Sequence, residues 1–168
     1  MITIQPHVDR KGHMLLTTEI VVPKDRSEVF EFFADAGNLE AITPPWVNFH
    51  IVTERPINMK AGALIDYRLK LHHIPIRWRT EISAWEPPFR FVDRQLRGPY
   101  RTWEHLHTFE EVEGGTAVAD EVTYCVPGGK LINRFFVEPD LRKIFTYRQQ
   151  QLHKMLCGEP EQASASPT

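Results

Sequence analysis

Two histidines lie two positions apart, His105 and His107, and aspartates stand on the segments before and after them, Asp93 and Asp120. Alternate residues of an extended strand point to the same face, which would place the two imidazoles about 6.6 Å apart along a strand. Imidazole paired with carboxylate can act as a general acid or base, and both groups are zinc ligands. These residue types therefore allow proton transfer, metal coordination or hydrogen bonding to a ligand.

Turn geometry decides whether these side chains meet. A four-residue hairpin loop around the Gly-Gly pair places His107 opposite Asp120, and directly opposite residues share a face with Cβ atoms about 4.5–5.5 Å apart. A three-residue loop at the Gly-Pro pair places Asp93 opposite His105, whereas a two-residue turn would point Asp93 elsewhere. We favour the three-residue loop. The sequence thus predicts two pairs, His107–Asp120 and Asp93–His105.

The face that these residues share combines aromatic and polar groups. It is predicted to carry Tyr67, Trp78, Thr80, Asp93, Gln95, Trp103, His105, His107, Asp120 and Tyr124. An isolated buried charge costs several kcal/mol, so Asp120 needs a partner. Arg148 falls on the apolar face of a predicted helix, where it either extends outward to solvent or pairs with Asp93, Asp120 or a ligand carboxylate.

Three interpretations of this cluster are open. The first is structural, because buried polar groups are nearly always satisfied by their neighbours. The second is a ligand site with aromatic walls and a few convergent polar groups. The third is catalysis or metal binding, for which an alternating pair of histidines is a weak signal, and no nucleophile motif accompanies it. We predict no metal and no cofactor, and keep His105, His107, Asp93 and Asp120 as catalytic candidates.

Strands, short helices and one long helix are expected to position these residues. Residues 14–22 form the first predicted strand, and two short helices follow it. The further predicted strands are residues 46–54, 63–71, 74–85, 89–96, 100–111 and 116–126. From Pro139 the apolar period changes to that of a helix of about 18 residues. Its buried face is predicted to comprise Leu141, Ile144, Phe145, Arg148, Leu152 and Met155.

This element order predicts an α+β architecture, in which a curved antiparallel sheet of six to seven strands wraps around the long C-terminal helix. One helix cannot fill a curled sheet along its whole length, so a cavity is expected. Residues 1–157 are expected to form a single ligand-binding domain. Within it, residues 1–12 are expected to be loosely held, and the polar residues 158–168 to form a disordered tail.

The bulk composition excludes several classes of function. Net charge is -2 over 168 residues, with 42% hydrophobic and 25% charged residues. Without a basic stripe, nucleic acid is not an expected partner. No apolar run reaches the roughly 18–20 residues that span a bilayer, and the N-terminus has no signal-peptide pattern. The two cysteines, Cys125 and Cys157, make no disulfide framework and are expected to be free thiols in a cytoplasmic protein.

Over about residues 14–156 the chain resembles the START/birch-pollen-allergen-like superfamily with the helix-grip fold, also labelled SRPBCC or polyketide cyclase/dehydrase-like. The pattern is similar to that of a bacterial subgroup. It comprises Leu39-Glu40-Ala41-Ile42-Thr43-Pro44-Pro45-Trp46, Ile74-Pro75, Trp78, Phe91, Asp93, Gln95, Gly98-Pro99-Tyr100, Trp103, His105, His107, Phe109, Asp120, Val122 and Tyr124. The resemblance implies the helix-grip fold. It covers lipid and hormone carriers, aromatase/cyclases and co-chaperone or toxin-like proteins, so it does not assign one activity.

We therefore expect binding of a small hydrophobic or amphiphilic molecule between the sheet and the last helix. The expected ligand-binding residues are Trp46, Tyr67, Trp78, Gln95, Trp103, His105, His107, Tyr124 and Arg148. The first alternative is a cyclase or dehydratase in which a histidine–aspartate pair moves a proton. The second is a protein-interaction module that uses the outer sheet face, although the charged residues expected there argue against it.

Overall fold

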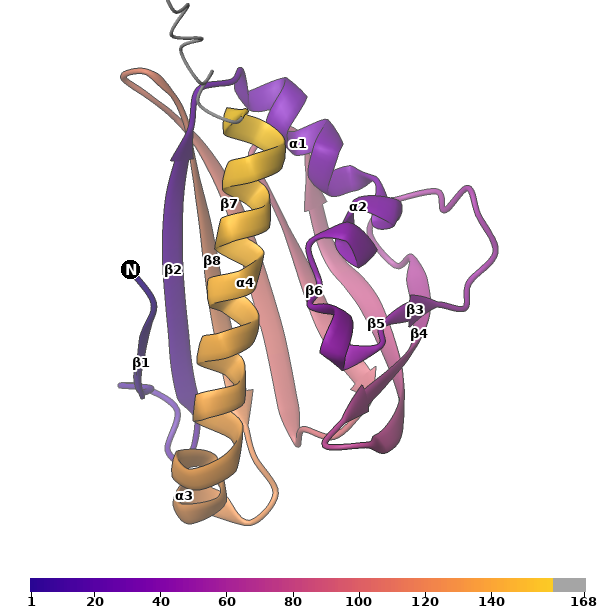
Figure 1. Cartoon of the computed structure of the whole chain (residues 1–168), viewed down its shortest axis with the longest axis vertical. Coiled ribbons are helices and arrows are strands. Elements are labelled where there is room, and N and C mark those ends of the chain that lie inside the picture. The colour runs from indigo at the N-terminus through magenta and orange to yellow at the C-terminus, as the bar shows by residue number, and fades with distance from the viewer. Residues whose placement is uncertain (159–168) are drawn as a thin grey trace, which may run out of the picture.

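The computed structural model describes residues 1–158, so the predicted tail lies outside the described residues except for Gly158. These residues form an eight-stranded antiparallel sheet with a long helix, α4 (Glu138–Cys157), running along one face (Figure 1). The strands are β1 (Thr3–Pro6), β2 (Met14–Val22), β3 (His50–Ile51), β4 (Leu64–Leu71), β5 (Ile74–Glu86), β6 (Arg90–Arg97), β7 (Thr102–Val112) and β8 (Gly115–Cys125). Their order is β1-β2-β8-β7-β6-β5-β4-β3, which confirms the predicted helix-grip α+β fold.

The strand count exceeds the prediction because one sheet edge carries a short additional strand, β1. The expectation that residues 1–12 are loosely held is wrong, since β1 pairs with β2 in the register Thr3↔Thr17. Residues 46–54 are also not the continuous strand that was expected. A 3-10 turn, η1 (Pro45–Val47), comes first, Asn48 then takes a left-handed conformation with φ 47°, and only the two residues of β3 pair with β4.

Short helices cover the part of the sheet that α4 leaves open (Figure 1). Helices α1 (Arg26–Ala34) and α2 (Ala36–Ala41) follow β2, as predicted. Helix α1 contacts β7 and β8, whereas α2 contacts β3. A short helix, α3 (Gly129–Ile132), and a π-helical turn, η2 (Asn133–Val137), lead into α4.

Helix α4 buries one stripe against the sheet. Its buried residues are Leu141, Phe145, Arg148, Leu152 and Leu156. Met155 was predicted on this face but is 41% exposed, and Leu156, the next residue, is buried instead; a period of 3.6 residues allows either position one turn beyond Leu152. The first half of the helix packs on Leu16 and Val122, and the second half on Phe109 and Val118.

No helix among the described residues is both long enough and apolar enough to cross a bilayer.

Candidate functional site

A cavity of about 320 Å³ lies between the inner sheet face, α4 and the two short helices. Most of its wall is aliphatic or aromatic. Representative apolar wall residues are Phe33, Leu39, Tyr67, Trp78, Trp103 and Ile144. Trp78 stands edge-on to Trp103, with ring centroids 5.5 Å apart, so the indoles form one continuous aromatic surface.

Asp93, His105, His107 and Arg148 together line one region of this largely apolar wall, which also includes the polar residues Asp35, Asn38, Thr43, His72, Thr80 and Asp140. Strand register brings the first three together. β6 and β7 pair Asp93 with His105, and β7 and β8 pair His107 with Asp120, as the turns predicted. The β7–β8 hairpin is tighter than expected, since the ends of its predicted loop also pair, but the register is unchanged.

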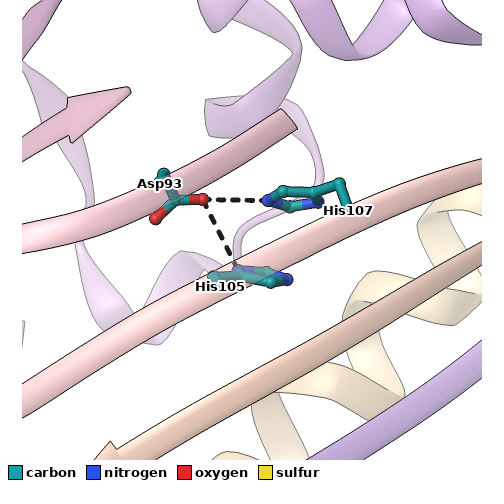
Figure 2. A group of neighbouring side chains, drawn as sticks. All are labelled: Asp93, His105 and His107. Carbon is teal, nitrogen blue, oxygen red and sulfur yellow. Dashed lines mark hydrogen bonds and ion pairs between the residues drawn. The ribbon is translucent and has the colours of Figure 1, made fainter. Parts of the chain in front are cut away.

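The side chains connect diagonally rather than straight across. His105 Nε2 lies 2.9 Å from Asp120 Oδ1, and His107 Nε2 lies 2.9 Å from Asp93 Oδ2, both as hydrogen bonds. The predicted partners are ion-pair contacts, with His107 Nδ1 2.9 Å from Asp120 Oδ1 and His105 Nδ1 3.7 Å from Asp93 Oδ2. Each imidazole therefore contacts both carboxylates, because diagonal neighbours are still within reach of long side chains. Figure 2 shows one carboxylate oxygen of Asp93 facing both imidazoles.

Aromatic stacking fixes the two rings. The imidazoles stack on each other with centroids 3.8 Å apart, and Phe91 stacks on the far side of His107 at 4.1 Å. The side chains of His105 and His107 are 8% and 4% exposed, whereas that of Asp93 is 21% exposed. Asp93 is thus the member of this group that is most open to the cavity.

Arg148 reaches the cluster from α4, on the opposite side from the sheet. Its Nη2 and Nε lie 3.3 Å and 3.4 Å from the two carboxylate oxygens of Asp120. Its guanidinium also lies 5.4 Å from the ring centroid of Phe33. Asp93, Asp120, a ligand carboxylate and solvent were the partners predicted for Arg148. The structure shows a contact with Asp120.

The cluster shifts the pKa values of its members in different directions. Burial opposes ionisation of Asp120, but Arg148 and the two imidazoles outweigh it and hold its pKa well below its ordinary value. Burial also opposes charge on His107, yet hydrogen bonds to Asp120 and Asp93 raise its pKa. Burial and the neighbouring His107 lower the pKa of His105. One imidazole therefore holds a proton more readily than the other.

Not every predicted ligand-binding residue reaches the cavity. Tyr67, Trp78, Trp103, His105, His107 and Arg148 all line it. Three others do not. Trp46 is 59% exposed and packs on Tyr147, Gln95 hydrogen-bonds the backbone of Tyr100 in the β6–β7 loop, and Tyr124 is buried among core residues.

The helices and the cavity entrance contribute residues that the sequence did not single out for the site. Phe33 of α1 lines the cavity and contacts both His107 and Arg148. His72, in the β4–β5 turn, lies 2.5 Å from Asp140 of α4, and both line the cavity. The helical spacing of Phe33 from Phe30 is a signal that could have marked the inner face of α1, but nothing in the sequence links His72 to Asp140.

Comparison with known proteins agrees with this architecture. The family model described as polyketide cyclase/dehydrase and lipid transport matches residues 22–151. No curated protein sequence matches the chain.

Solved structures show the same fold at low sequence identity. A protein from Mycobacterium smegmatis aligns with TM-score 0.66 and 18% identity over 93% of this chain and 98% of its own. A protein from Staphylococcus epidermidis gives TM-score 0.66 and 15% identity over 98% and 99% of the two chains. The ginseng major latex-like protein from Panax ginseng gives TM-score 0.63 and 11% identity over 86% and 98%.

Proposed function

The chain belongs to the polyketide cyclase/dehydrase and lipid transport family, in the START/birch-pollen-allergen-like superfamily, and from this membership we propose that it binds one small amphiphilic molecule in its cavity. The observation that carries the proposal is a largely apolar cavity of about 320 Å³ with a charged cluster on one part of its wall. Small-molecule sites typically combine an apolar lining with a few convergent polar groups.

Cavity size restricts the ligand. Typical small-molecule pockets measure about 300–1,000 Å³, so this cavity is at the lower end of that range. A compact ring system fits such a space better than an extended acyl chain. The flat walls formed by Trp78 and Trp103 also favour a planar or aromatic ligand body.

The charged cluster orients the ligand. Polar atoms on the ligand would face Asp93, His105 and Arg148, because burying them against the aromatic wall would leave them without hydrogen bonds. The apolar body would then lie against the opposite wall, where each Å² removed from water contributes about 25 cal/mol. The expected ligand therefore has one polar end and one apolar end.

Binding of an apolar fluorescent probe, such as anilinonaphthalene sulfonate, tests the proposal. The wild-type chain should bind it at one saturable site. Ile144→Trp places a larger ring in the cavity from α4 and should weaken binding about tenfold or more, because it occupies the space that the probe needs. The measurement is a fluorescence titration, repeated by native mass spectrometry.

Met155→Trp is the matched control, since residue 155 is also on α4 but is 41% exposed and does not line the cavity. It adds the same ring to the surface and should leave the probe affinity unchanged. Equal affinities for the wild type and both variants, or no saturable site at all, would refute the proposal.

A second candidate function is acid–base catalysis of the cyclase or dehydratase type. The exposure of the Asp93 carboxylate, hydrogen-bonded to His107 and open to the cavity, favours it. Such a pair could move a proton on an enolisable substrate held against the aromatic wall. Asp93→Asn should then abolish turnover of a polyketide-like substrate and leave its binding largely intact, whereas equal loss of both would count against catalysis.

The outer sheet face does not favour the protein-interaction alternative. It carries paired charges, among them Asp66–Arg79, Glu81–Arg94 and Glu86–Arg90. Paired surface charges of this kind are typical of a solvated face rather than of an apolar docking patch.

A further inference from the structure

The two imidazoles present their nitrogens to two carboxylate oxygens in a specific pattern. On one side, His107 Nε2 and His105 Nδ1 lie 2.9 Å and 3.7 Å from the same oxygen, Asp93 Oδ2. On the other side, His105 Nε2 and His107 Nδ1 both lie 2.9 Å from Asp120 Oδ1. Asp93 thus faces one nitrogen of each ring, and Asp120 faces the other.

Proton counting makes this pattern informative. A neutral imidazole carries one N–H, and its second nitrogen is a lone pair. In the structure the hydrogen bond between His107 Nε2 and Asp93 Oδ2 holds a proton between them, whereas His107 Nδ1 makes no hydrogen bond although it lies 2.9 Å from Asp120 Oδ1. If a metal ion replaces that proton and each ring directs its N–H toward Asp120, two lone pairs and the Asp93 carboxylate face the ion. Arg148 does not supply the positive charge there, because its guanidinium is directed at both oxygens of Asp120.

We propose that Asp93 Oδ2, His105 Nδ1 and His107 Nε2 bind a divalent transition metal such as Zn²⁺ or Fe²⁺ at the charged end of the cavity. One ligand atom from each residue lies within 4.8 Å of the others, and Figure 2 shows the three side chains converging. Ligand bonds of about 2.0–2.2 Å place donor atoms about 3.0–3.5 Å apart. To reach that spacing the two stacked imidazoles must turn toward each other, and His105 Nδ1 must approach Asp93 from 3.7 Å.

Asp120 has the position of an outer-shell residue in this arrangement. Histidines that bind metal almost always donate their other N–H to a carboxylate or carbonyl, which fixes the tautomer and the ring orientation. Asp120 Oδ1 lies 2.9 Å from the far nitrogen of each ring, and Arg148 in turn balances its charge. The cluster thus contains three candidate metal ligands and a carboxylate, Asp120, that can accept the N–H of each histidine ring.

Two histidines and one carboxylate leave coordination positions open, a set typical of catalytic Zn²⁺ and of non-haem Fe²⁺. The three ligand residues line the cavity whereas Asp120 does not, so the open positions face the cavity. With Asp120 balanced by Arg148, a divalent ion beside Asp93 leaves one excess positive charge. The site would therefore favour an anionic ligand group, such as a carboxylate or enolate. This ligand preference rests on the proposed binding function, whereas metal binding itself does not.

Titration of chelator-treated protein with Co²⁺, followed by its visible absorption bands, and with Zn²⁺ in competition with a chromophoric chelator tests the proposal directly. The wild type should bind one ion per chain with micromolar or tighter affinity. Asp93→Asn preserves side-chain size and removes the ligand charge, so both affinities should fall about 100-fold or more. His153→Gln, which removes an exposed histidine on α4, should leave both affinities unchanged and controls for surface binding.

A proton NMR spectrum of the Co²⁺-loaded wild type provides a readout that needs no variant. The ring protons of His105 and His107 should show paramagnetic shifts. Unshifted histidine resonances, or an Asp93→Asn variant that binds as tightly as the wild type, would overturn the metal site. The metal titration contains no apolar ligand, and the probe-binding experiment uses metal-free protein. A negative result in one experiment is therefore distinct from a negative result in the other.

Discussion

At the scale of single residues, Asp120 is the side chain that contacts both histidines and Arg148. It is 4% exposed and is contacted by two imidazoles and one guanidinium. A buried ion pair contributes little net stability over an apolar replacement, but removal of one partner leaves the other charge buried and unpaired. The identity of residue 148 therefore matters to stability as well as to ligand binding.

Arg148→Met should lower the free energy of unfolding by about 3 kcal/mol, because it keeps an apolar stem in place and leaves Asp120 without its cation. Chemical denaturation measures the change. Arg142→Met removes an arginine of the same helix whose ion pair with Glu138 is solvent-exposed, and it should cost less than about 1 kcal/mol. The double variant Arg148→Met/Asp120→Asn should recover part of the loss. No recovery would show that Arg148 stabilises the chain through packing alone.

The sequence predicted which charged residues meet, but not how they connect. Period-two alternation and the turn lengths set the register of His105, His107, Asp93 and Asp120, and the structure confirms that register. Whether a ring contacts the residue directly opposite or its diagonal neighbour depends on side-chain rotamers. Those rotamers are fixed here by stacking of the two imidazoles on each other and of Phe91 on His107; the register places Phe91 opposite His107, but it does not give the ring orientations.

At the scale of elements, the β7–β8 hairpin sets the geometry of the site. Its strong alternation and the Gly-Gly pair made the register predictable, whereas β5 and β6 contain register shifts that no local signal marks. The short edge strand β1 was also missed, and the strand predicted over residues 46–54 was too long. In β3 only two residues pair, and the backbone N–H of Ile51 is bonded instead by the Glu40 side chain. Local pattern therefore predicts long paired strands better than bulges and edges.

The two glycines of that hairpin, Gly114 and Gly115, differ in how much space surrounds the position that a Cβ would occupy. Gly115 has φ +146°, and a Cβ there would lie 2.0 Å from the backbone oxygen of Val22. Gly115→Ala should therefore cost about 3 kcal/mol or more of unfolding free energy, because strand β2 must shift. Gly114 has φ +88° with open space around it, so Gly114→Ala should cost only about 1–2 kcal/mol of backbone strain. Denaturation of both variants checks the difference, and equal losses would contradict the close approach to Val22.

At the scale of the whole molecule, incomplete coverage of the sheet produces the cavity. Helix α4 packs along β2, α1 contacts β7 and β8, and α2 and η1 contact β3 and β4, respectively, near the other edge (Figure 1). Bulges between β5 and β6 bend that part of the sheet, which moves its inner face away from a straight helix. A hydrophobic core forms where α4 and the sheet meet, and a cavity remains where they diverge.

A contact between two elements that are distant in sequence borders this cavity. The β4–β5 turn consists of His72 and His73, both with positive φ, and it projects His72 toward Asp140 at the start of α4. The His72 side chain is 64% exposed and lines the cavity, so it stands where the cavity meets solvent. We expect this contact to restrict exchange of the ligand rather than to stabilise the fold.

His72→Ala should accelerate dissociation of the apolar probe about 2- to 5-fold, because an exposed polar contact of this kind contributes up to about 1 kcal/mol. The free energy of unfolding should change by less than that amount. His73→Ala is the matched control, since it removes the same side chain from the same turn, also at positive φ, but outside the cavity lining. Stopped-flow displacement measures both rates. If the two variants release the probe at the same rate, or if His72→Ala changes stability alone, the ligand leaves by another route.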